Sequence, residues 1–132
     1  MDFDIDKRTS KTKHQYSEEN LDLAYEFTKK IHRELGEVLK AVILFGSTAR
    51  KEEDANDIDI LLIADDVTIN FSKELVQTYR VIVEQKVRET SEKIHVTSMK
   101  LTSFWEYIRN GDPIALNILR DGFALIDTGF FD

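Results

Sequence analysis

Cysteine is absent from this chain of 132 residues, and proline occurs only once. The absence of cysteine excludes disulfide bonds and thiolate metal sites. Long apolar runs are missing as well, and the run at 60–64 is far too short for a membrane-spanning helix. The opening stretch, MDFDIDKRTSKTK, lacks the apolar core of a signal peptide. From these absences we expect a cytoplasmic protein without membrane association.

Positive charge is the scarcer sign, with 18 lysines and arginines against 25 aspartates and glutamates, for a net charge of −7. Nucleic acid binding depends on a basic surface, so a nucleic acid partner is not expected, although composition does not exclude one. A nucleotide remains compatible with this charge, because a divalent cation can hold its phosphates. A hydrophobic content of 42% and this length predict one folded domain.

Periodicity divides the chain into a flexible N-terminal arm, residues 1–16, and a folded domain, residues 17–132. In the domain, helical stripes alternate with short apolar runs that are typical of buried strands. We expect helices at 17–36, 72–91, from a capping box at 103–106 to Gly111, and at 113–120, and strands at 41–45, 57–63, 93–99 and 123–127. This order predicts an α/β (α+β) domain.

Two aspartates, Asp57 and Asp59, stand at the start of the second expected strand. Because side chains alternate along a strand, both carboxylates lie on one face, with Ile58 on the other. Two carboxylates this close repel each other, and a divalent cation bound between them offsets their negative charge. Oxygen ligands suit Mg²⁺ or Mn²⁺, so the pair predicts a site for one of these metals.

A glycine–serine pair, Gly46 and Ser47, ends the preceding strand. Glycine allows a ligand to approach the backbone closely, and the backbone N–H groups and hydroxyl beyond it can hold phosphate oxygens. Arg50, a few residues on, adds a cation for the same phosphates. One strand thus predicts a phosphate site, and its neighbour predicts the metal ligands.

The sequence FGSTAR followed by DIDI resembles the signature of the DNA polymerase β-like nucleotidyltransferase superfamily, and in particular its minimal nucleotidyltransferases. The resemblance implies a small mixed β-sheet with helices packed on one face and the active site on the other. It implies transfer of a nucleoside monophosphate from a nucleoside triphosphate, with ATP expected, to a hydroxyl. Gly46, Ser47 and Arg50 match the phosphate-binding positions, and Asp57 and Asp59 match the metal-binding acids.

A third carboxylate of that family, usually on the third strand, has no counterpart at residues 94–99. His95 and Thr97 occupy the polar face of that strand instead. Histidine serves widely as a general base, so His95 is a candidate catalytic residue. Two alternatives stay open: another acid, Glu92 or Asp65, reaches the site, or the chain is a weak or inactive module that binds a nucleotide or a partner.

The acceptor is not specified by any motif. The resemblance implies a separate helical partner of the HEPN type, in an arrangement like a toxin–antitoxin pair in which the transferase modifies its partner. The sequence also leaves a homodimer open, and it does not fix the base preference of the nucleotide.

Overall fold

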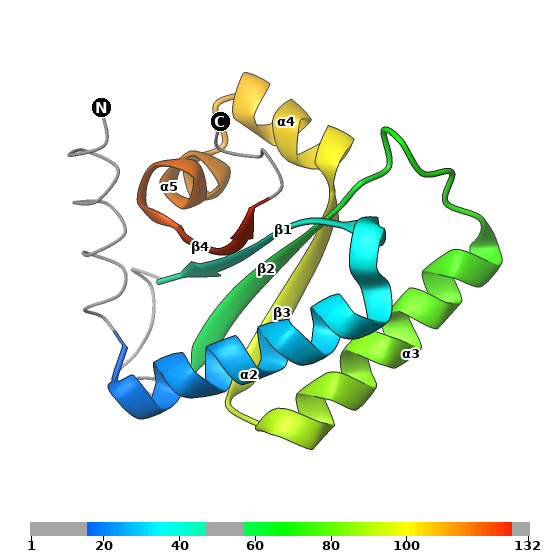
Figure 1. Ribbon diagram of the computed structural model, residues 1–132. Coiled ribbons are helices and arrows are strands. Elements are labelled where there is room, and N and C mark those ends of the chain that lie inside the picture. The colour runs from blue at the N-terminus through cyan, green and yellow to red at the C-terminus, as the bar shows by residue number, and fades with distance from the viewer. Residues whose placement is uncertain (1–15, 47–56, 128–132) are drawn as a thin grey trace.

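A four-stranded sheet organises the residues that the computed structural model describes, 16–46 and 57–127 (Figure 1). Its strands are β1 (Leu39–Phe45), β2 (Ile58–Ala64), β3 (Ile94–Lys100) and β4 (Phe123–Asp127). Their order across the sheet is β3-β2-β1-β4. β1 is antiparallel to both β2 and β4, whereas β2 and β3 are parallel. The predicted class, an α+β domain with a small mixed sheet, is confirmed.

The first face of the sheet is covered by the two long helices, α2 (Glu18–Leu35) and α3 (Lys73–Thr90). Ser17 caps α2 by accepting a hydrogen bond from the Asn20 amide at 3.1 Å, and Gly36 ends the helix with a positive φ of 50°. The inner stripe of α2 is buried against the sheet and consists of Ala24, Phe27, Thr28, Ile31 and Leu35. The sequence predicted both helices to within a residue or two.

The second face carries two short helices, α4 (Leu101–Arg109) and α5 (Pro113–Asp121), which Figure 1 shows on the side away from α2 and α3. Phe104 of α4 and Ile118 of α5 pack against Ile43 and Leu61 of the central strands. The expectation that helices cover one face therefore describes the long helices only. The central strands are apolar on both faces around Ile43 and Leu61. Helices therefore cover the second face there as well.

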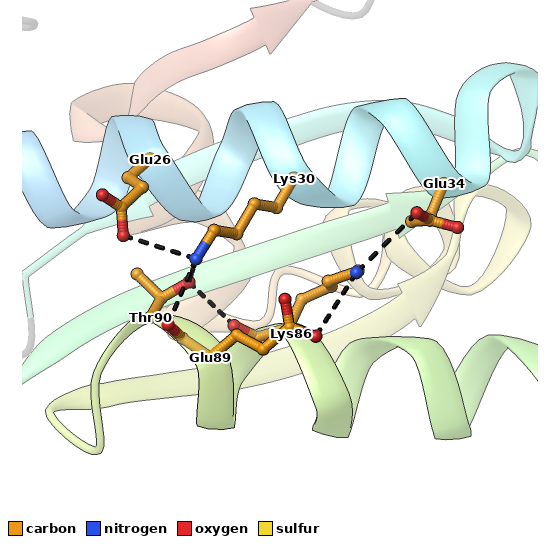
Figure 2. A network of polar contacts seen from close by, with 6 residues as sticks. All are labelled: Glu26, Lys30, Glu34, Lys86, Glu89 and Thr90. Atoms are coloured by element: carbon orange, nitrogen blue, oxygen red, sulfur yellow. Dashed lines mark hydrogen bonds and ion pairs between the residues drawn. The ribbon is translucent and has the colours of Figure 1, made fainter.

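Lysine side chains join α2 to α3 (Figure 2). Lys30 lies 3.5 Å from the Glu26 carboxylate and donates to the backbone carbonyl of Glu89 at 3.1 Å, in the last turn of α3. Lys86 lies 3.7 Å from Glu34 and 3.4 Å from Glu89. A cation at a helix C-terminus contributes about 0.3–1 kcal/mol, so the apolar stripe, not this network, dominates the packing of the two helices.

The start of α4 differs from the sequence prediction. The capping box expected at 103–106 is wrong, since the helix begins at Leu101 and its cap residue, Lys100, makes no side-chain cap. Asp66, from the loop after β2, accepts hydrogen bonds from the amide and the hydroxyl of Thr102 instead. A cap from a distant part of the chain has no local sequence signature, which explains the error. α5, in contrast, has a local cap, with Asp112 accepting a hydrogen bond from the Ala115 amide at 2.9 Å.

Candidate functional site

The two halves of the sequence motif meet at one end of the sheet. Phe45, the last residue of β1, pairs with Asp59 of β2, and Asp59 pairs in turn with His95 of β3. Gly46 leaves β1 directly beside this row and is half-buried. The C-terminal end of β1 and the N-terminal ends of β2 and β3 therefore bring Gly46, Asp59 and His95 to the same edge.

The second face of the sheet carries the polar side chains of β2 at this end. Ile58 and Ile60 are fully buried in the core beneath α2 and α3. By alternation, Asp59 points to the opposite face, which it shares with Leu61 and Ile63. α4 and α5 cover those two residues, but Asp59 lies beyond that cluster and is half-buried. The site therefore occupies the less covered half of the second face.

His95 lies on the same face of β3, since its neighbours Ile94 and Val96 pack into the first core. Its Nε2 atom is 3.3 Å from Oδ1 of Asp57, an ion pair whenever the imidazole is protonated. The two side chains are 58% and 33% exposed, so ligands from solvent have access to them. The geometry thus joins His95 to the acid pair, which the sequence alone left undecided. Thr97 is exposed on the same strand and pairs in register with Leu61.

Tyr16 is a residue of this region that the sequence did not reveal. Its side chain is only 7% exposed, and its hydroxyl donates a hydrogen bond to the carbonyl of Phe45. The same hydroxyl accepts from the amide of Asp59 at 3.3 Å. Tyr16 therefore bridges the two residues of the last β1–β2 pair, between the candidate phosphate and metal residues. Its place directly before the helix cap Ser17 was the available signal.

The remaining residues that the sequence proposed for the site have three different outcomes. Ser47 and Arg50 lie outside the described residues. Asp65 lies beyond the opposite end of β2, about 20 Å of strand from Asp59, and a hydrogen bond from the Thr68 hydroxyl is the main reason its pKa is lowered. Asp65 is therefore not a third acid of the site. Glu92 is exposed in the turn before β3, at the correct end of the sheet.

The donor set suits a hard divalent cation in its chemistry. Among the described residues, no three His, Asp or Glu side chains gather closely enough to enclose a metal. Asp57 and Asp59 nevertheless bring two carboxylates to one accessible edge, and Mg²⁺ commonly takes one or two protein carboxylates and completes its shell with water and substrate phosphates. The residues present thus fit a metal that binds together with a nucleotide. In the described part of the chain, no helix is long and apolar enough to span a membrane.

Comparison with protein families identifies the kind of domain that this chain contains. The family model "Nucleotidyltransferase domain" matches residues 26–112, which include β1, β2, β3 and both halves of the motif. This match covers more than half of the chain, and the protein belongs to the nucleotidyltransferase domain family. A search of curated proteins gave no significant match.

Proposed function

We propose that this nucleotidyltransferase transfers a nucleoside monophosphate from ATP to a hydroxyl of an acceptor, with Mg²⁺ or Mn²⁺ as cofactor, in the cytoplasm. The observation that carries the proposal is the convergence of Asp57, Asp59 and His95 on one accessible edge beside Gly46. Family membership supports nucleotidyl transfer in general. The acidic pair and the glycine supply the two features that a nucleotide with its metal requires.

Each residue has a proposed role in that reaction. Asp57 and Asp59 hold the metal, which when bound offsets phosphate charge and polarises the α-phosphate. Gly46 and Ser47 bind the phosphates through backbone N–H groups and the serine hydroxyl, with Arg50 as an added cation. With the metal and the phosphates held by these residues, the protein must also align the acceptor hydroxyl with the α-phosphorus.

His95 is the proposed general base. The acceptor oxygen bonds to the α-phosphorus, the bond to the bridging oxygen breaks, and pyrophosphate leaves. His95 takes the proton that the acceptor hydroxyl loses. Its Nε2 atom, 3.3 Å from Asp57, is already beside the acid pair, and its exposed position leaves room for an acceptor. General-base catalysis of this kind contributes about 10²–10⁴-fold.

The acceptor we propose is a helical partner protein of the HEPN type, modified as in a toxin–antitoxin pair. Its support is the resemblance of the motif to minimal nucleotidyltransferases. Incubation with α-labelled ATP and such a partner should transfer label to the partner and release pyrophosphate. Label that remains in ATP under these conditions would contradict the choice of acceptor but not the nucleotide site.

A second candidate is a binding module without turnover. It is favoured by the absence of a carboxylate at residues 94–99, where His95 and Thr97 face the site. Pyrophosphate release separates the two. If His95 is the base, His95→Ala should lower kcat by about 10²-fold or more, with ATP affinity unchanged, and His95→Asp should retain turnover. ATP binding without turnover in the wild type would establish the binding module.

A further inference from the structure

A groove runs between helix α3 and edge strand β3, on the first face of the sheet. It consists of two hollows of about 320 and 520 Å³, which share Val83 and Glu84 and therefore form one continuous depression. We call it the α3–β3 groove. Its apolar lining comes from Val76, Val83 and Val87 of α3 and from Ile94 and Val96 of β3.

The strand beside the groove has an open edge. β3 is the outermost strand of the described sheet, and no other described strand pairs with its outer side. An edge strand presents unpaired N–H and C=O groups that accept a further strand, and proteins commonly protect such edges. A groove between a helix and an open strand edge is a geometry that binds extended peptides, with main-chain bonds to the strand and alternate side chains in the groove.

The rim of the groove is basic, although the whole chain carries a net charge of −7. Arg80, Arg88 and Lys100 border it, against one acid, Glu84. All four side chains are exposed. Within the described residues, neither arginine takes part in a hydrogen bond or an ion pair, whereas the charge of Lys100 acts on Asp66. Two arginines eight residues apart on α3, with Glu84 midway between them, and Lys100 thus leave the rim of the groove with a net positive charge.

The positive charge of the rim distinguishes between two occupants of the groove, a second copy of this chain and an acidic segment of another protein. A second copy of the chain, paired edge to edge through β3, would bring two basic rims together, and like charges at an interface are unfavourable. An acidic segment matches the rim. We propose that the α3–β3 groove binds an extended segment of another protein that joins β3 as an added strand, with apolar side chains in the groove and carboxylates beside Arg80 and Arg88.

The added strand would also reach the candidate site. Its side chains alternate, so those that do not enter the groove lie on the face of His95 and Thr97. The second hollow extends along β3 to His95 itself. A protein held in this groove therefore stands next to the acid pair, although the binding does not require that any transfer occurs.

The probe is a displayed library of random peptides of about eight residues, the length of an ordinary strand, selected on the full chain. The enriched peptides should carry apolar residues and Asp or Glu at the same set of alternate positions, those that face the groove and its arginines, and should lack central proline. A labelled peptide from this set should lose affinity by about tenfold or more with Arg80→Glu/Arg88→Glu, because two attractive charges become repulsive. The matched control, Arg33→Glu/Arg109→Glu, changes two exposed arginines outside the groove and should leave affinity unchanged.

Amide hydrogen exchange supplies an independent reading. Bound peptide should slow the exchange of amides within residues 94–100, because the added strand pairs with them. Failure to enrich acidic peptides, or equal binding by both double variants, would overturn the proposal. So would a dimer in sedimentation that buries β3 and excludes the peptide. None of these outcomes depends on nucleotidyl transfer, so the result is separate from the test of the proposed function.

Discussion

The two faces of the sheet differ in how far they are covered. On the first face, α2 and α3 cover β2 from Ile58 to Ala64, and no polar side chain of that strand lies beneath them. On the second face, the residues of β2 that α4 and α5 cover are Leu61 and Ile63, and Asp59 lies beyond them beside His95. The first face, which is covered along the whole of β2, supplies stability, whereas the second face combines a core at one end with an accessible polar site at the other.

Adjacent leucines in β2 test the covered part of both faces and should show the largest effect. Leu61 is 1% exposed beneath α4 and α5, and Leu62 is fully buried beneath α2 and α3. Leu61→Ala and Leu62→Ala should each lower the free energy of unfolding by about 2–5 kcal/mol, measured by urea denaturation. Leu116→Ala, at a side chain 40% exposed on α5, is the control and should cost much less. A small loss for Leu61→Ala would show that the second face is not a true core.

The tyrosine bridge tests the border between core and site, with an intermediate effect. Tyr16→Phe removes the hydroxyl that accepts from the Asp59 amide and donates to the Phe45 carbonyl. The loss should cost about 1–3 kcal/mol and should speed hydrogen exchange at the Asp59 amide. Tyr25→Phe, at an exposed tyrosine of α2, serves as the control. Unchanged exchange at Asp59 in Tyr16→Phe would contradict the bridging role.

Acid titration of Asp66 tests how the start of α4 is held on the second face. Its expected effect on stability is the smallest of the three. Burial favours a raised pKa for Asp66, but hydrogen bonds from the Thr102 hydroxyl and amide outweigh it, so the pKa is lowered. A lowered folded pKa means that the stabilisation is present above the unfolded pKa, near 3.9, and is lost as the pH falls through the folded value. Asp66→Ala should therefore cost about 1 kcal/mol at neutral pH.

The measurement is urea denaturation of the wild type and Asp66→Ala between neutral pH and acid. The difference in stability should shrink once the pH falls below about 4, since the carboxylate then becomes protonated. Asp22→Ala, an exposed aspartate of α2, controls for the loss of one negative charge. A difference that stays constant down to the lowest pH would show that the charge of Asp66 does not hold the start of α4.

The sequence predicted the first face well, because its information is local. The two long helices, α2 and α3, and the alternation of β3 each depend on neighbouring residues, and each matches the structure. The side-chain faces of Asp59 and His95 also followed from alternation alone. Family resemblance then named the fold and its class of reaction.

The missed features all depend on contacts between distant parts of the chain. The cap of α4 comes from Asp66, 36 residues before Thr102, and the bridge to Phe45 comes from Tyr16, 29 residues before it. Packing of α4 and α5 on the second face is likewise a tertiary contact. No periodicity records such contacts, so the pairing of His95 with Asp57 also needed the strand order to be known.

The central claim is that the accessible end of the second face is a metal-dependent nucleotide site. Its most direct test is calorimetric titration of the protein with ATP, in Mg²⁺ and in EDTA, for the wild type and for Asp57→Asn/Asp59→Asn, with circular dichroism to show that both are folded. We predict binding by the wild type in Mg²⁺ only, and none by the double variant. Equal binding by the double variant, or binding that is indifferent to EDTA, would contradict the account.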